Sequence, residues 1–458
     1  MQRRTFLAGL PVALVAAAAV VGSAGANPSP SFSNTRLTVP LTQTFPAVVS
    51  QTTGDSEPSV SIGTDGHMVV GGLSWIPAQV NMWTGTAGSV PSFFGAMDQN
   101  IGLNGNGRFA VGDGDEDFDV GSTGTTHFAD LIFIPSKGKE QLGVAETNCP
   151  AGATSKAQCD ERVLDTAGAD RQWITSNGSN VWLSWHDSGN STLIHVAYSA
   201  DDGETWTKVG SPIPGQGAAT GDATFDNDQG PIVADPTTGD VFDIYAAGQP
   251  GIQKATSAAF NNIYVSRSTD NGKKWDSTLV FHAPLFTGLN NVFPSLAVDP
   301  TNGKLYAVWT DTHGVALSTS TDHGATWSAP QIVSSIQTTV MPWVAAYNGK
   351  VDVVYYGTPA ASTDDASAVW NTYDAQSTGS AFTQLKVSNT PNHVGVICLS
   401  GDACSNQLQT RTLLDLFEVS ENPLTGKASI VYTDDTFHTW TQNGTTYPLP
   451  EIVLAQEQ

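Results

Sequence analysis

Aspartates alternate with glycine between residues 112 and 119, in the run Gly-Asp-Gly-Asp-Glu-Asp-Phe-Asp. The carboxylates of Asp113, Asp115 and Asp117 suit Ca²⁺, a hard cation that prefers several oxygen ligands. The run lacks the spacing and the final Glu of an EF-hand loop. A solvated acidic loop and a catalytic carboxylate at Asp117 remain alternatives. Crowding of like charges would raise the pKa of one of these carboxyl groups unless a cation compensates.

Other carboxylates precede or begin strand-like apolar segments along the chain. Glycoside cleavage requires only two carboxylates that flank the scissile bond, so this set could perform it. The candidate catalytic residues are Glu57, Asp117, Asp170, Arg171 and Asp415. The candidate substrate-binding residues are Asp228, Asn291 and Arg411. The alternative is structural, because the same side chains could cap strand ends.

A repeated strand-and-turn pattern would bring these residues together. Its clearest copy is the apolar segment 293–298, followed by the turn Asp-Pro-Thr-Asn-Gly at 299–303 and two further strands. The pattern predicts seven inner strands, which start near residues 57, 117, 171, 230, 293, 342 and 415. We therefore expect an all-β, seven-bladed β-propeller of four-stranded antiparallel blades, with these residues around one mouth of its channel. Six blades are the alternative, because the copies at 117 and 342 are weaker.

The phrase Ser-x-Asp-x-Gly-x-x-Trp occurs three times, at residues 199–206, 268–275 and 320–327. It predicts a tight hairpin turn in which Asp accepts hydrogen bonds from turn amides, Gly adopts a positive φ and Trp packs under the turn. The residues expected in these roles are Asp201, Gly203, Trp206, Asp270, Gly272, Trp275, Asp322, Gly324 and Trp327. The three copies fall in the third, fourth and fifth predicted blades.

This phrase resembles the Asp-box of the sialidase-like (BNR-repeat) β-propeller superfamily, and the resemblance covers roughly residues 40–455. It implies a bacterial secreted propeller, and the superfamily's enzymes favour a glycoside hydrolase or lyase. Seven predicted blades depart from true sialidases, which have six. The Phe/Tyr-Arg-Ile-Pro motif of sialidases is also missing, since residues 75–77 and 133–135 lack the Arg. Exo-sialidase activity is therefore not expected, and an acidic mouth would repel sialic acid.

Net charge and the first residues indicate where the protein works. With a formal charge of −24, the chain has no excess of Lys and Arg to replace the counterions of nucleic-acid phosphates. This argues against a nucleic-acid partner. Arg3 and Arg4, an apolar run at 10–21 and small residues at 24–26 predict a twin-arginine-like export signal over residues 1–26. Ordinary secretion and an uncleaved surface anchor are alternatives. We expect a leader at 27–37 and a single propeller domain at 38–458.

Four cysteines fall in two close pairs, Cys149 with Cys159 and Cys398 with Cys404. In an exported chain this spacing predicts two local disulfides. Strand-like segments at 38–49 and 451–455 could each supply an outer strand that joins the last blade to the first.

Three functions fit these observations. The first is a secreted carbohydrate-active enzyme, which acts on extracellular carbohydrate or glycoconjugate through its acidic mouth. The second is a non-catalytic propeller that binds glycan or protein, and the third is a structural component stabilised by calcium. Ca²⁺ is the only cofactor expected. We expect a monomer that has no contact with nucleic acid and none with a membrane after signal cleavage.

Overall fold

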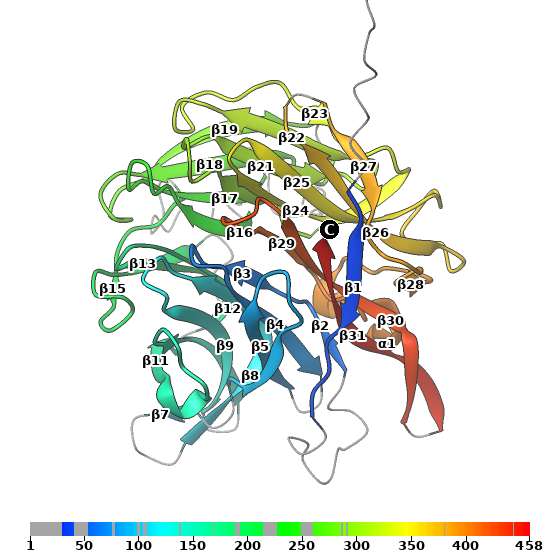
Figure 1. Cartoon of the computed structure of the whole chain (residues 1–458), viewed down its shortest axis with the longest axis horizontal. Coiled ribbons are helices and arrows are strands. Elements are labelled where there is room, and N and C mark those ends of the chain that lie inside the picture. Colours follow the sequence, from blue (N-terminus) through cyan, green and yellow to red (C-terminus); the bar gives the residue numbers. More distant parts are fainter. Residues whose placement is uncertain are drawn as a thin grey trace, which may run out of the picture. The chain divides into compact units, whose positions relative to one another are not determined.

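Short apolar segments separated by Gly, Pro and Asn turns give this chain antiparallel strands. The computed structural model describes residues 30–40, 54–75, 78–98, 101–103, 108–136, 139–166, 168–187, 193–213, 227–248, 260–284, 287–289, 292–379, 381–442 and 444–458. Within these ranges the strands form seven antiparallel sheets, which are the blades of a β-propeller (Figure 1). The predicted seven-bladed fold is confirmed, and the six-bladed alternative is wrong.

The first three blades follow one another along the chain. Blade 1 contains β2 (Asp55–Ser56), β3 (Val60–Ile62), β4 (His67–Trp75), β5 (Ala78–Thr86) and β6 (Ser92–Ala96). Blade 2 contains β7 (Ile101–Leu103), β8 (Arg108–Val120), β9 (Thr126–Ser136), β10 (Lys139–Cys149) and β11 (Asp160–Asp165). Blade 3 contains β12 (Ala169–Asn177), β13 (Asn180–Asp187), β14 (Ile194–Ser199) and β15 (Thr207–Lys208).

The next three blades have the same order of strands. Blade 4 contains β16 (Asn227–Ala234), β17 (Val241–Ala247), β18 (Asn262–Ser268) and β19 (Asp276–His282). Blade 5 contains β20 (Ser295–Val298), β21 (Leu305–Thr310), β22 (Val315–Ser320) and β23 (Gln331–Ile332). Blade 6 contains β24 (Thr338–Tyr347), β25 (Lys350–Thr358), β26 (Val369–Ser377), β27 (Thr383–Lys386) and β28 (His393–Val394).

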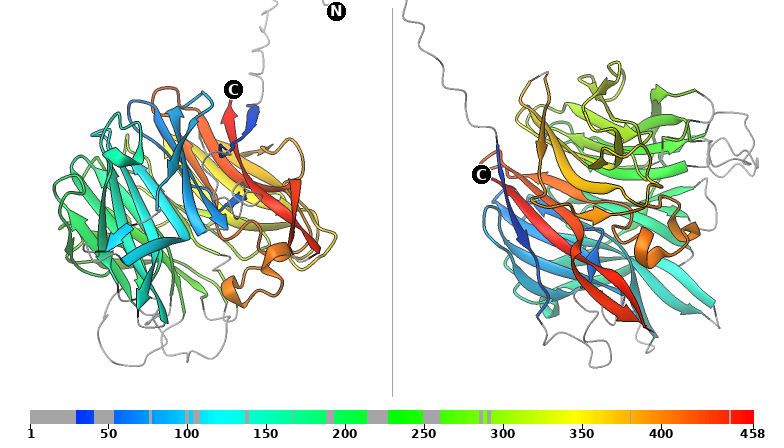
Figure 2. Two further views of the ribbon diagram at one scale, coloured as in Figure 1. Left: turned by 90° about the horizontal axis from the view of Figure 1, so that it is seen from below. Right: turned by 90° about the vertical axis from the view of Figure 1, so that its right-hand side faces the viewer.

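Blade 7 joins the two ends of the described chain. It contains β29 (Glu418–Glu421), β30 (Ala428–Gln442), β31 (Thr445–Glu457) and, as its outermost strand, β1 (Phe32–Arg36). Figure 2 shows β1 beside β31 near the C-terminus. The closing strand at 32–36 therefore comes from the segment expected to be a leader, and the propeller starts before residue 38. A strand was also expected over residues 38–49, but residues 41–49 lie outside the described part of the chain.

Neighbouring blades share their cores. Side chains point alternately to the two faces of a strand, so adjacent residues of one strand enter different interfaces. Val241 packs between blades 3 and 4, and the next residue, Phe242, packs between blades 4 and 5. Leu305 and Tyr306 divide in the same way between the two faces of blade 5. This alternation explains why both faces of the strands are apolar and why the sequence reads as short apolar runs.

Side chains of the inner strands also bond to the backbone of the next blade. Glu418 of blade 7 accepts a hydrogen bond from the Val60 amide of blade 1 at 2.9 Å. Asp117 of blade 2 accepts one from the Ile174 amide of blade 3 at 2.7 Å. A hydroxyl makes the same link from blade 3 to blade 4, where Thr175 accepts from the backbone of the next inner strand. Buried backbone donors at the channel are thus satisfied across blade boundaries.

The three repeated phrases form the same turn between the last two strands of blades 3, 4 and 5. In the first copy the Asp201 carboxylate accepts from the Thr205 amide at 2.8 Å, and Ser199 Oγ accepts from the Gly203 amide at 3.0 Å. The Trp206 indole donates to the Gly203 carbonyl at 2.9 Å. The same bonds recur in the other two copies. Each Gly has a positive φ, as the phrase predicts.

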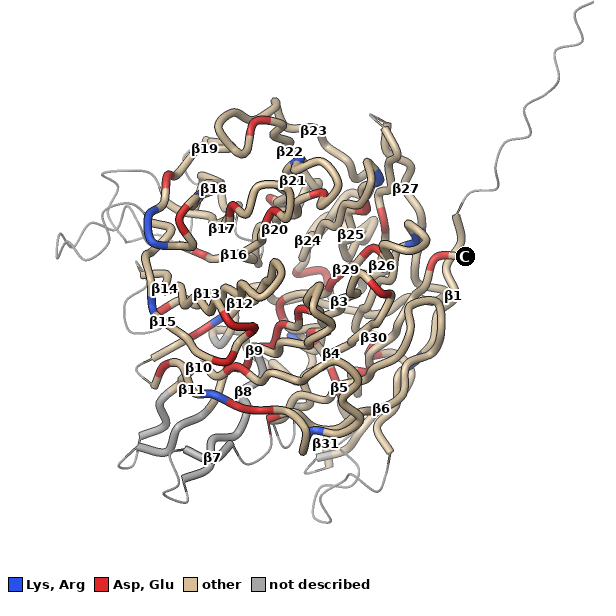
Figure 3. The backbone as a smooth tube through the Cα atoms, turned by 60° about the vertical axis from the view of Figure 1, so that its left-hand side comes forward, with Lys and Arg blue, Asp and Glu red and all other residues tan. Residues whose placement is uncertain are grey.

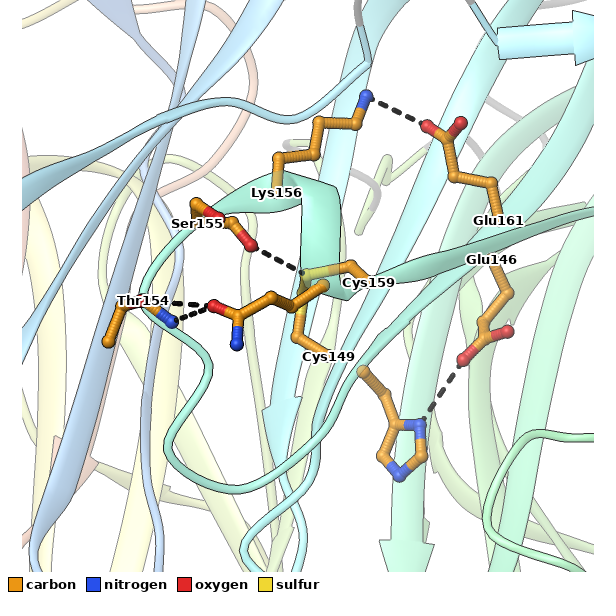
Figure 4. Close-up of a disulfide and its surroundings, with 9 residues drawn as sticks. Glu146, Cys149, Thr154, Ser155, Lys156, Cys159 and Glu161 are labelled. Carbon is orange, nitrogen blue, oxygen red and sulfur yellow. Dashed lines mark hydrogen bonds and ion pairs between the residues drawn. A yellow bond between two sulfur atoms is a disulfide. The ribbon is translucent and has the colours of Figure 1, made fainter.

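Both predicted disulfides are present, Cys149–Cys159 and Cys398–Cys404. The first links the end of β10 to the short helix η2 (Lys156–Gln158), beside the Lys156–Glu161 ion pair (Figure 4). The second closes a loop that carries η4 (Gly401–Ala403) and leads into α1 (Gln407–Thr410). No helix in the described ranges is long and apolar enough to span a membrane.

Candidate functional site

Unusual backbone conformations mark one end of the inner strands. Glu57, Arg171, Met341 and Leu414 have φ between 50° and 55°, a region that L-residues other than Gly, Asn and Asp rarely adopt. Arg171 and Met341 lie where their strands bulge and the register with the next strand shifts. Such strain costs roughly 1–3 kcal/mol per residue and is found most often at functional sites. Because a bulge re-aims a side chain, these four positions define a candidate site, which we call the channel mouth.

A chain of ion pairs crosses the channel mouth and connects three blades. Arg171 of blade 3 places one terminal nitrogen 2.5 Å from Glu57 of blade 1 and the other 3.3 Å from Asp415, which precedes β29 of blade 7. Arg411 then bonds Asp415 through Nη2 at 2.6 Å. The side chains of Glu57, Arg171 and Asp415 are each less than 10% exposed, whereas Arg411 is half-buried. Two guanidinium groups and two carboxylates therefore alternate, and their charges balance.

Covalent and backbone links position Arg411. The Cys398–Cys404 disulfide lies in the loop before it, and the Cys398 amide donates to the Thr410 carbonyl at 2.8 Å. Burial lowers the pKa of Arg411, but the charge of Asp415, its hydrogen bond and the charge of Glu57 together outweigh burial, so the pKa is raised. Arg411 thus keeps its charge, and it bonds the same Asp415 oxygen, Oδ2, that Arg171 contacts.

Aromatic side chains flank this chain of charges. The Arg171 guanidinium lies 4.3 Å from the centroid of the Phe293 ring and 5.9 Å from that of Trp173. Trp173 contacts Phe293 edge-on at 6.0 Å and Trp343 at 5.3 Å between centroids. Trp173 is fully buried, while Phe293 and Trp343 are half-buried and keep part of their surface exposed. Charged groups beside partly exposed rings can bind the polar edge and the apolar face of a sugar.

Further carboxyl groups lie buried near this chain of ion pairs. Burial raises the pKa of Asp55 to about 7, although a hydrogen bond from Asn81 opposes the shift. Burial also raises the pKa of Glu116, and the nearby charges of Glu418 and Glu57 add to the effect. Both Glu116 oxygens lack a hydrogen-bond partner among the described residues. The raised pKa values favour the protonated forms of Asp55 and Glu116.

The structure brings together four of the eight residues predicted to be catalytic or substrate-binding: Glu57, Arg171, Arg411 and Asp415. Asp117 instead holds the backbone of the neighbouring blade, as the strand-capping alternative describes. Asp170 is exposed next to Arg171, and Asp228 is half-buried in β16. Asn291 lies outside the described residues. The catalytic and binding roles of all eight stay predictions.

Sequence reasoning did not assign Phe293 or Trp343 to the site. Each lies in a segment that reads as a core strand, and periodicity cannot distinguish a buried ring from one at the rim of a channel. A signal was available, because aromatic residues occur near the starts of three inner strands, at Trp173, Phe293 and Trp343.

The predicted calcium site can be followed only in part. Asp113 and Asp115 belong to β8, where its register with β9 shifts, but their side chains lie outside the described set. In the described part of the chain, no group of three or more His, Cys, Asp or Glu side chains is arranged to hold a metal ion. Binding of Ca²⁺ by Asp113, Asp115 and Asp117 stays a prediction. Figure 3 shows acidic segments over many blades and few basic ones.

Comparisons with known proteins find no matching family model and no matching curated protein. Several solved structures are similar. A protein of unknown function from Dyadobacter fermentans has a TM-score of 0.47 at 10% identity, over 93% of this chain and 97% of that one. A Penicillium chrysogenum alpha-L-arabinanase has 0.43 at 11%, over 93% and 98%. The leech intramolecular trans-sialidase has 0.42 at 14%, over 91% and 69%. None of these similarities identifies a reaction, so function must be argued from the residues of this chain.

Proposed function

We propose that this protein is a secreted carbohydrate-active enzyme, a glycoside hydrolase or lyase, whose active site is the channel mouth. Glu57 and Asp415 are the reacting carboxyl pair, and Arg171 with Arg411 positions them. Phe293 and Trp343 offer the apolar surface against which a sugar ring packs. The substrate is an extracellular glycan.

The observation that carries this proposal is that one guanidinium holds two carboxylates from different blades. Glu57 and Asp415 approach opposite terminal nitrogens of Arg171, so they lie on either side of a single group. Two carboxyl groups that flank the scissile bond are the minimum that glycoside hydrolysis requires. Glu57 and Arg171 both have a strained, left-handed backbone, and such strain is found most often at functional sites.

Charge balance at the mouth favours an uncharged sugar. Arg171 and Arg411 already contact carboxylates, so neither offers a free guanidinium to a substrate carboxylate. Desolvating an anionic sugar beside Glu57 and Asp415 would be costly. Exo-sialidase activity is accordingly not part of the proposal.

Secretion is supported by two local disulfides, because such bonds persist in oxidising compartments. The twin-arginine-like segment at residues 1–26 supports export as well. Purification from culture medium and sequencing of the N-terminus test both points, since cleavage near residue 26 is expected.

The test of the reaction is a screen of the secreted protein on aryl-glycosides and polysaccharides, with and without Ca²⁺. Turnover should appear on at least one neutral substrate and should be lost in Glu57→Gln and in Asp415→Asn. Asp117→Asn is the matched control, because its carboxylate serves the backbone of blade 3. Turnover that survives both mouth substitutions would exclude this site as the reaction centre.

A non-catalytic glycan-binding propeller is the second candidate. The deep burial of Glu57 and Asp415 favours it, since both side chains are covered and already paired. In that case no substrate is turned over, yet neutral oligosaccharides bind and Phe293→Ala or Trp343→Ala weakens the binding. Binding without turnover would move the protein to this second function.

A further inference from the structure

A second cavity lies at the rim of the propeller, away from the channel mouth. It has a volume of about 270 Å³ and opens between the outermost strands of blades 2 and 3. Figure 1 labels these two strands, β11 and β15. Its lining residues are Arg162, Val163, Leu164, Ala197, Trp206 and Lys208. We call it the rim cleft. None of the residues at the channel mouth contributes to it.

The floor of the rim cleft is apolar and rigid. The Trp206 indole donates to the Gly203 carbonyl at 2.9 Å, which fixes the plane of the ring. The same ring and Leu164 pack on the core shared by blades 2 and 3. Trp206 is half-buried, so one part of the ring remains available. A ring held this way loses little conformational entropy when a ligand stacks on it.

Two ion pairs border this floor. Arg162 bonds Glu204 at 2.6 Å, and Lys208 bonds Asp165. Arg162 is held further by Glu146, 3.8 Å away, which in turn contacts His127 at 3.2 Å. Each cation at the cleft therefore has an anionic partner, and donors and acceptors alternate around an apolar centre.

We propose that the rim cleft binds one ring of a neutral carbohydrate, stacked on Trp206 with its hydroxyls between the two ion pairs. A sugar ring has an apolar C–H face for the indole, and its hydroxyls both donate and accept hydrogen bonds. Phosphorylated or sulfated ligands would need an uncompensated cation, which neither Arg162 nor Lys208 provides. The cleft is also smaller than the roughly 300–1,000 Å³ of sites for drug-sized ligands, which suits a single ring. This inference is independent of the reaction proposed at the channel mouth.

The experiment is calorimetric titration with neutral xylo-, arabino-, malto- and galacto-oligosaccharides, alongside uronate and sulfated sugars. All titrations use the full chain carrying Glu57→Gln, so that hydrolysis at the mouth does not consume the ligand. Leu164→Trp adds bulk on the face of β11 that packs beside Trp206, outside the repeated turn, and Glu204→Gln removes the charge of one exposed partner. Lys273→Gln is the matched control, because Lys273 occupies in the second repeated turn the position that Glu204 occupies in the first.

The expected result is binding of at least one neutral series, weakened at least about tenfold by Leu164→Trp and about threefold by Glu204→Gln. Lys273→Gln should bind as the parent does. Failure of every neutral series to bind, binding of charged sugars alone, or unchanged binding in both cleft variants would overturn the proposal. Should Leu164→Trp fail to fold, Glu204→Gln and Lys208→Met decide the question, since both side chains are exposed.

Discussion

Two ion-pair networks, one at the channel mouth and one near the closure of the ring, both join different blades but differ in construction. At the closure, Lys350 of β25 bonds Asp352 at 2.7 Å, Glu457 at 2.8 Å and Glu421 at 3.2 Å. These residues join blades 6 and 7, and none of them has a positive φ. The mouth network instead holds Glu57 and Arg171 on left-handed backbone beside partly exposed aromatic rings.

We infer from this difference that the buried charges at the closure serve the fold and that those at the channel mouth serve a ligand. At the closure, burial lowers the pKa of Lys350, but the charges of Asp352 and Glu421 outweigh it and raise the pKa overall. The residues of this network lie in regular strands without backbone strain. Their ionic contacts alone therefore explain why these charged groups are buried together. At the channel mouth, by contrast, the paired residues have a strained backbone. Such strain is expected of a site that binds a ligand.

Activity should respond most strongly to the mouth carboxylates. Glu57→Gln and Asp415→Asn should each lower kcat/KM by about 10⁴-fold, because each removes a reacting carboxyl group without changing its shape. Steady-state kinetics on the substrate identified by the screen measures this effect. A loss below about tenfold in both variants would mean that the mouth network is structural, like the network at the closure.

Stability should respond next, at the closure. Lys350→Met leaves the buried Asp352 and Glu421 and the half-buried Glu457 without their cation, which should cost about 3–5 kcal/mol in the free energy of unfolding. Urea denaturation measures the loss, and kcat of the protein that remains folded should not change. Lys304→Met is the control, because it removes a Lys from the turn side of blade 5. Equal stability of the two variants would refute the closure role.

A smaller, pH-dependent effect is expected at Asp55, beside the mouth. Burial raises its pKa from 3.8 to about 7, so its protonated form is favoured in the folded state. The stability it contributes is fully present below pH 3.8 and is lost as the pH rises through about 7, at most about 4 kcal/mol by linkage. Thermal unfolding between pH 4 and pH 8 should show a slope that is flatter in Asp55→Asn. Identical slopes would contradict the assignment.

The smallest expected effect lies in the third repeated turn. His323 has a φ of 57°, and its counterpart in the second turn is Asn271, with a φ of 61°. Asn tolerates this conformation better than His, so His323→Asn should stabilise the fold by a few tenths of a kcal/mol. Differential scanning calorimetry can detect the rise in Tm. The reverse change, Asn271→His, should lower the Tm by a similar amount, and a shift of the same sign in both would refute the explanation.

The sequence determined the parts of this protein that depend on local patterns. Alternating apolar residues and short turns specify strands over a few residues, so all seven inner strands could be predicted. The repeated turns depend on bonds between residues at most four positions apart, such as Ser199 with Gly203. The disulfides span separations of 10 and 6 residues, which close spacing alone predicts.

Only the tertiary structure decided which charged residues meet. Arg171 contacts Glu57 across 114 positions and Asp415 across 244, and no local pattern encodes either contact. Asp117 and Glu57 are both carboxylates at the start of a predicted inner strand, yet Asp117 accepts a hydrogen bond from the Ile174 amide of the next blade. The outer closing strand at 32–36 likewise depends on where the C-terminal hairpin leaves an unpaired edge. These outcomes follow from ring closure and from backbone bulges, whose energies depend on all seven blades packing at once.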